Sequence, residues 1–176
     1  RNVAQASLRN FGTWWMDLTV TKGQGEYDCT HYIGVYLLPL SYLAQWSHAP
    51  VMRGRAVKML DWLIADVAVE LTGGSFGGSH ARTDDAAVLE PGVNVAADFA
   101  WLLFGLGKPS PGYAGYAFYY AVASAHRPPA VLHAIATDRG AAYFHRERKR
   151  TRNRWRFTDV KHAPVYRSAY LSKSYA

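Results

Sequence analysis

Two runs of apolar residues at helical spacing, separated by a proline-containing break, most constrain how this 176-residue chain can fold. Thr30 can cap the first run, which contains Pro39. Pro50 suits the first position of a second helix that extends to about Leu71. Two consecutive helices with a short connection are expected to pack antiparallel. The first apolar face consists of Ile33, Tyr36, Leu37, Leu40, Leu43 and Ala44, and the second of Met52, Ala56, Leu60, Leu63, Ile64, Val67 and Leu71.

Periodicity predicts further helices and then strands. The expected helices cover residues 94–105, 112–126 and 130–137. From Ala142 onward, aromatic and β-branched residues alternate, which is typical of strands. We therefore predict a mainly α fold, with a helical region at 1–141 and a basic, strand-like segment at 142–176 that leads towards a β part.

Composition excludes several classes of protein. Cys29 is the single cysteine, so the chain has no internal disulfide, zinc-finger cluster or CxxC pair. The longest apolar stretch, Tyr32 to Ala44, is shorter than the roughly 20 residues of a membrane span. No motif for a metal, nucleotide or other cofactor is present, and we expect none to be used.

The net charge of +7 is concentrated in one segment. Residues 146–156 carry seven Lys or Arg and one Glu, which leaves about +1 for the rest of the chain. Such a run could bind phosphates, but alternate arginines also suit one face of a strand that meets solvent, protects a sheet edge or faces an acidic polysaccharide. Nucleic-acid binding is the less favoured interpretation.

The best candidate for a functional site lies where the first apolar helix begins. Two carboxylates, two phenols and an imidazole occur within seven residues, at a helix end that favours anions. General acid–base catalysis uses such groups. In the structural alternative, Asp28 or Thr30 only caps the helix and the tyrosines belong to the core. The candidates are Glu26, Tyr27, Asp28, His31 and Tyr32.

A glycine-rich segment from Thr72 to Asp85 is the second candidate. It carries Ser79, His80, Arg82, Asp84 and Asp85, and its guanidinium could hold a carboxylate through two hydrogen bonds. The alternative is a solvated connector.

Aromatic side chains could supply sugar-stacking surfaces. Trp14 and Trp15, together with the tyrosines of residues 112–126, combine flat apolar faces with polar edges. Most of these side chains are expected in the core, and the two tryptophans are our candidates for substrate contact.

The order of these motifs resembles that of large bacterial proteins of the α/α-toroid kind. The resemblance covers residues 11–107 and depends on Gly-Glu-Tyr-Asp-x-Thr-x-Tyr at 25–32, a second helix that opens at Pro50, and Gly-Gly-Ser-His-Ala-Arg at 77–82. These proteins are similar to the alginate-lyase and heparinase II/III-like polysaccharide lyases, in which a helical toroid precedes a β-sandwich.

The resemblance implies an incomplete (α/α) toroid that binds an acidic polysaccharide. It further implies β-elimination at a uronate, with Tyr27, His31 or Tyr32 as base or acid and with His80 and Arg82 as the neutralising pair. Glu26, Asp28 and Asp84 would contact substrate. It places the protein outside the cell or in the periplasm, and we expect the chain to be part of a longer protein.

Two other functions are compatible with the sequence. A glycoside hydrolase would use Asp28 with Asp84 or Asp85 as paired carboxylates. A non-catalytic module would use the aromatic side chains to bind glycan without cleaving it.

Overall fold

A computed structural model confirms the mainly helical prediction and adds a few short strands. It forms two compact units: Arg1–Tyr27 with Arg146–Arg167, and Asp28–His145 with Ser168–Ala176. No helix among the described residues is both long and apolar enough to cross a membrane. The structure describes residues 2–26, 28–78, 80–83, 85–90, 94–111, 115–149 and 163–176.

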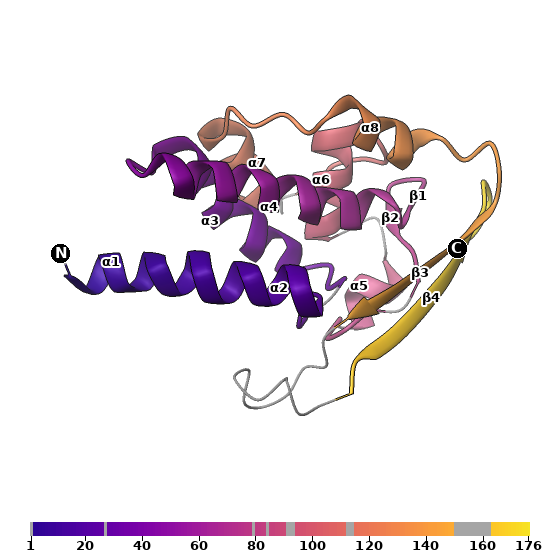
Figure 1. The fold of residues 1–176 in the computed structure, drawn as a ribbon. Helices are drawn as coiled ribbons and strands as arrows, with labels where there is room; N and C mark the ends of the chain where they lie inside the picture. Colours follow the sequence, from indigo (N-terminus) through magenta and orange to yellow (C-terminus); the bar gives the residue numbers. More distant parts are fainter. Residues whose placement is uncertain are drawn as a thin grey trace. The chain divides into compact units, whose positions relative to one another are not determined.

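The first unit begins with a continuous helical rod, drawn in indigo in Figure 1. It consists of α1 (Asn2–Arg9), a π-helical segment (Asn10–Trp15) and α2 (Met16–Lys22). We predicted a helical region at 1–141 but no individual helix over these residues. Their aromatic side chains belong to the rod, where the rings of Phe11 and Trp15 stack with centroids 4.8 Å apart. Gly23 ends the rod at φ +86°, a backbone conformation that glycine adopts without a Cβ clash.

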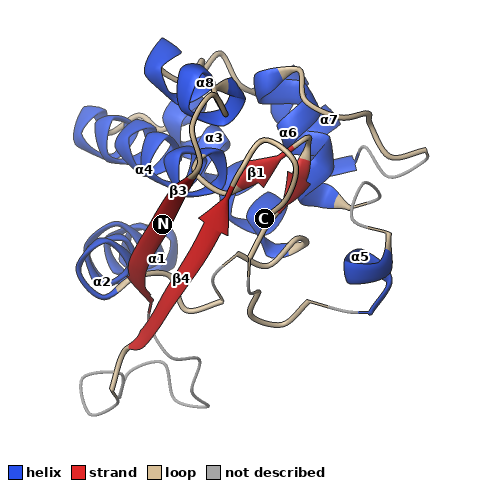
Figure 2. Cartoon of the chain, turned by 90° about the vertical axis from the view of Figure 1, so that its right-hand side faces the viewer, coloured by secondary structure: helices blue, strands red, loops and turns tan. Residues whose placement is uncertain are grey.

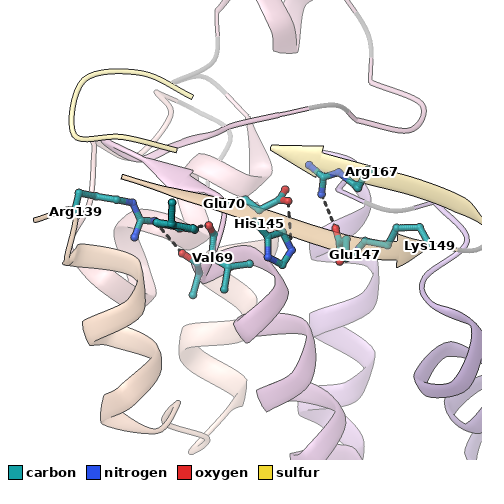
Figure 3. Close-up of polar contacts among 9 residues, drawn as sticks. Val69, Glu70, Arg139, His145, Glu147, Lys149 and Arg167 are labelled. Carbon is teal, nitrogen blue, oxygen red and sulfur yellow. Dashed lines mark hydrogen bonds and ion pairs between the residues drawn. The ribbon is translucent and has the colours of Figure 1, made fainter. Parts of the chain in front are cut away.

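A buried ionic cluster is the main polar feature of the first unit (Figure 3). The Glu147 carboxylate lies between two cations, 2.8 Å from the Lys149 ammonium and 2.7 Å from the Arg167 guanidinium. Arg146 and Arg148 are exposed at alternate positions of the same strand. The alternate arginines at 150, 152, 154 and 156 lie outside the described residues.

The second unit contains the two helices that the sequence predicted most directly. They are α3 (Tyr32–Trp46) and α4 (Pro50–Ala68), and they pack against each other. Pro50 occupies the first turn of α4, as predicted. The prediction that Thr30 caps α3 is wrong, because His31 is the N-cap and makes no side-chain cap bond. Thr30 instead accepts a hydrogen bond from Ala96 N through its backbone carbonyl, at 2.9 Å, which joins α3 to a helix distant in sequence.

A β-hairpin follows α4 where we expected more helix and then a loop. β1 (Leu71–Thr72) pairs antiparallel with β2 (Ser75–Phe76) (Figure 2). Gly73 and Gly74 form the turn at φ +60° and +92°, which is the backbone region that tight hairpin turns require. The helix therefore ends at Ala68, three residues before the predicted end.

The remaining helices largely match the prediction. Asn94 caps α6 by accepting a hydrogen bond from Ala97 N at 2.9 Å, and Gly105 ends it in the left-handed region. The short helix α5 was not predicted, and the described part of α7 ends three residues before the predicted end. The elements are α5 (Asp85–Leu89), α6 (Val95–Phe104), α7 (Gly115–Ala123) and α8 (Ala130–Thr137).

The predicted strands are also present. β3 (Tyr143–Lys149) pairs with β4 (Val165–Leu171) (Figure 2), and the division between the two units falls inside both strands. Within the second unit, the beginning of β3 lies against the end of α4, where the Tyr143 hydroxyl donates to the Val69 carbonyl. His145 Nε2 lies 3.8 Å from the fully buried Glu70 carboxylate (Figure 3).

Arg139 neutralises the carboxyl end of α4. Its guanidinium donates to the carbonyls of Ala68 (3.1 Å) and Leu71 (2.6 Å and 3.1 Å). The last carbonyls of a helix lack intrahelical donors and carry partial negative charge, so a cation there is stabilising. The side chain thereby links the end of α8 to the end of α4 and to β1.

A buried Tyr–His–Asp relay fixes the end of α7. The Tyr120 hydroxyl lies 2.8 Å from His126 Nδ1, and His126 Nε2 lies 2.8 Å from the Asp61 carboxylate on α4. Since the carboxylate accepts from Nε2–H, the neutral ring accepts from the tyrosine at Nδ1. Burial raises the pKa of Tyr120 from 10.0 to about 12.

This burial predicts a specific loss of stability in alkali. The unfolded chain ionises Tyr120 near its ordinary pKa, whereas the folded chain keeps it neutral up to about 12. The stabilisation is therefore complete below pH 10 and is lost between about pH 10 and pH 12. Relative to Tyr120→Phe, the wild-type free energy of unfolding should fall by roughly 1 kcal/mol between about pH 9 and pH 11, measured by urea denaturation. A difference that does not change with pH would contradict this assignment.

Candidate functional site

The two segments singled out by the sequence share an unusual backbone conformation. Asp28 and Arg82 have φ values of +53° and +56°, and they are the non-glycine residues with positive φ among the described residues. Aspartate tolerates this left-handed region, but an arginine there costs roughly 1–2 kcal/mol. Strain of this kind persists only where surrounding contacts hold it, and it is concentrated at functional sites.

Two hydrogen bonds hold these segments together. His80 Nδ1 lies 2.8 Å from the backbone carbonyl of Asp28. The Cys29 thiol donates to the backbone carbonyl of Arg82 at 3.1 Å. Cys29 and Asp28 are buried, so both bonds are shielded from water and contribute more than they would at the surface. The left-handed residues are therefore fixed by contacts between segments about 50 residues apart in the chain.

Four side chains of these two segments are at least partly exposed to solvent. Arg82 and His31 are exposed, and Tyr32 and His80 are half-buried. The Arg82 guanidinium carbon lies over the Tyr32 ring, 5.3 Å from its centroid. The rings of His31 and Tyr32 meet edge to face with centroids 5.7 Å apart. The structure thus gathers a phenol, a guanidinium and two imidazoles from the two segments.

The hydrogen bond to Asp28 also sets the chemistry of His80. A backbone carbonyl can only accept, so Nδ1 carries the proton. In the neutral ring the lone pair is then on Nε2, which can take up a proton. In the charged ring both nitrogens donate, and the ring can pair with an anion. His80 can therefore act as a base or as a cation, and the Phe76 ring packs beside it at a centroid distance of 5.4 Å.

Tyr116 is one of the tyrosines of residues 112–126 that could stack on sugars, but the sequence did not place it beside the catalytic candidates. Its ring, on α7, meets His31 edge to face with centroids 5.6 Å apart. His31 therefore contacts two tyrosine rings, Tyr32 and Tyr116. Gly34 permits this arrangement, since a Cβ at that position would lie 2.7 Å from Tyr116 Cγ and 2.7 Å from Val95 Cγ1. The sequence feature that could have indicated this close contact is Gly34 itself, a glycine inside a predicted helix three residues after His31.

The predicted site residues fall into three groups. The second unit brings together Asp28, His31, Tyr32, His80 and Arg82, with Asp28 contributing its backbone carbonyl while its side chain is buried. The first unit contains Trp14 and Trp15 on the π-helical segment and the buried Glu26. Tyr27, Ser79 and Asp84 lie outside the described residues, and the exposed Asp85 begins α5.

Comparison of the chain with models of protein families, with curated proteins and with solved structures gives no match.

The close approach at Gly34 gives a testable pair of variants. Gly34→Ala should lower the free energy of unfolding by roughly 1–3 kcal/mol, because the added methyl group must displace Tyr116 and Val95. Gly54→Ala is the matched control: it lies in α4, and a Cβ there would meet nothing within 4 Å. This control should stabilise the protein by about 0.5–1 kcal/mol through helix propensity alone. Thermal and urea unfolding measure both, and equal effects of the two variants would contradict the packing argument.

Proposed function

We propose that the cluster of His31, Tyr32, His80 and Arg82 is the substrate site of a polysaccharide lyase-like enzyme. Its substrate class is an acidic, uronate-containing polysaccharide, and its reaction is β-elimination. The observation that carries the proposal is the placement of Arg82 over Tyr32, with His31 and the oriented His80 in the same contact network. A cation next to proton-transfer groups is what elimination beside a carboxylate requires.

The reaction assigns a separate task to each kind of group. Arg82, with His80 in its charged form, pairs with the uronate carboxylate and stabilises the negative charge that develops on it. Tyr32 or His31 removes the proton from the carbon next to the carboxylate. The bond to the glycosidic oxygen then breaks, a carbon–carbon double bond forms, and the departing oxygen takes up a proton from the other of these two groups.

The backbone supports this assignment. The left-handed backbone at Arg82 lowers the stability of the protein, and a loop without a function would not need it. It is held by the hydrogen bond from the buried Cys29 thiol to the Arg82 carbonyl. Its effect is to hold the guanidinium over Tyr32 before substrate arrives. Such preorganisation lowers the cost of ordering the site during the reaction.

We also propose that the helix pairs of the second unit are part of an incomplete (α/α) toroid. The packing of α3 on α4, of α6 on α7 and of α8 on α4 supports this proposal. In a toroid, loops that precede helices line the substrate site, and His31 and Tyr32 lie at such a position at the start of α3.

The lyase proposal predicts an unsaturated product that absorbs ultraviolet light. Alginate, heparin and polygalacturonate form a suitable substrate panel for the 176-residue chain. Arg82→Ala should lower the rate by about 10²–10³-fold, since it removes the charge that stabilises the transition state. Arg53→Ala, an exposed arginine on α4, is the control and should leave the rate unchanged.

Two further variants separate chemistry from folding. His80→Asn keeps an N–H near the position of Nδ1, and so the bond to Asp28, but loses Nε2; the rate should fall by about 10²-fold. Arg82→Gly removes the guanidinium and also relieves the strain of the left-handed backbone, so the melting temperature should stay the same or rise while activity is lost.

Cleavage without an unsaturated product would indicate hydrolysis, and glycan binding without any product would indicate a binding module. Full turnover in both His80→Asn and Arg82→Ala would refute the assignment.

A further inference from the structure

Three aromatic rings form a row on the surface of the second unit. Phe144 on β3 and Tyr170 on β4 have ring centroids 5.0 Å apart, and the Tyr170 and Tyr175 centroids are 5.6 Å apart. Their side chains are 65%, 36% and 61% exposed, in the order Phe144, Tyr170, Tyr175. Exposed rings in contact with one another offer an apolar surface on which a ligand can stack.

The row is held in place by a hydrogen-bonded turn. After β4 the chain folds back, and the backbone N–H and the hydroxyl of Ser172 donate to the Tyr175 carbonyl at 2.9 Å and 2.8 Å. The Tyr175 N–H in turn donates to the Ser172 hydroxyl at 3.1 Å. A side-chain hydrogen bond with Tyr175 raises the pKa of Tyr170. The rings are therefore preorganised, which reduces the entropy lost when a ligand binds.

The chain after the row contacts the segment that leads to His80. Ala176, the neighbour of Tyr175, packs on Gly77, where an added Cβ would lie 2.5 Å from the Ala176 Cβ. Gly77 precedes His80 by three residues, and its N–H donates to the Glu70 carbonyl at 2.9 Å. The residue that follows the last ring of the row is thus in contact with the chain three residues before His80, within one unit.

The chemistry of the row favours an acidic sugar chain over an apolar partner. Aromatic faces stack on the C–H faces of a pyranose ring, and the two tyrosine hydroxyls can bond to sugar hydroxyls. The exposed Lys173 belongs to the same turn and supplies a positive charge for a carboxylate.

We propose that Phe144, Tyr170 and Tyr175 form an additional sugar-binding subsite for a uronate polysaccharide. The identity of the ligand rests on the function proposed above. A chain that occupies the cluster of His31, Tyr32, His80 and Arg82 extends onto these rings. The subsite adds affinity for long chains and takes no part in proton transfer.

The test measures binding and turnover separately. The variant Tyr170→Ala/Tyr175→Ala is compared with Phe118→Ala/Tyr119→Ala, whose side chains on α7 are 59% and 56% exposed. Hexasaccharides of mannuronate, guluronate and galacturonate are the acidic probes, and cellohexaose is the neutral one. Binding is measured by calorimetric titration with the acidic hexasaccharide that the wild type binds most tightly. Tyr170→Ala/Tyr175→Ala should bind it about tenfold more weakly than the wild type, and Phe118→Ala/Tyr119→Ala should bind it as the wild type does.

Lys173→Gln should weaken binding of the acidic hexasaccharide about threefold at low salt and leave binding of cellohexaose unchanged.

Activity provides the independent readout. Turnover of a uronate trisaccharide should be unchanged in Tyr170→Ala/Tyr175→Ala, whereas KM for the polymer should rise. If no variant of the chain shows lyase activity, the titration still tests the subsite, because loss of binding in this variant alone supports it. Equal binding by wild type and variant overturns the subsite, as does the absence of uronate binding by the wild type. A shift from dimer to monomer in the variant, without sugar binding, would instead assign the rings to a self-association surface.

Discussion

The hydrogen bonds between residues 28–29 and 80–82 are the constraint on which the candidate site depends. The bonds from His80 to the Asp28 carbonyl and from Cys29 to the Arg82 carbonyl join two segments that have no regular secondary structure of their own. The His80 imidazole and the Cys29 thiol are the donors and two backbone carbonyls are the acceptors, so the Arg82 guanidinium takes no part in these two bonds and lies over the Tyr32 ring. These two hydrogen bonds also explain how Arg82 remains in the left-handed region. Their free energy offsets the backbone strain at this residue.

Other contacts between distant parts of the chain fix the helices around this connection. Gly34 lets α3 approach Tyr116 and Val95 closely, and the carbonyl of Thr30 accepts from the first turn of α6. Farther from the site, Arg139 satisfies the last carbonyls of α4, and the relay of Tyr120, His126 and Asp61 fixes the end of α7. The contacts of the Thr30 carbonyl, of Arg139 and of the relay each use polar groups to end or align a helix whose apolar face supplies most of the packing. Tyr32 consequently lies on a helix whose position is fixed, whereas His80 and Arg82 are held by the two hydrogen bonds to residues 28–29.

The sequence predicted helices well where apolar spacing was regular. It anticipated both ends of α8 and the start of α4, since Pro128-Pro129 precedes the first and Pro50 opens the second. It missed the N-terminal rod because the π-helical segment has a different period, which moves the aromatic residues off a 3.6-residue face. It missed the β1–β2 hairpin because strands of two residues carry no alternation, although the Gly73-Gly74 pair is a hairpin signal. The cap at Thr30 failed for another reason: its carbonyl is used by a partner from α6, which local propensity does not register.

Residue types and their spacing determined which groups are available for chemistry: two imidazoles, an arginine and a tyrosine within two short segments, one at the start of an apolar helix. Tertiary structure decided that these groups meet, because the meeting depends on two hydrogen bonds between positions about 50 residues apart. It also decided that Tyr116 joins them and that Phe144, Tyr170 and Tyr175 form a row. A helical period shows which face of a segment is apolar, but the residue opposite that face is fixed only when the whole core has packed.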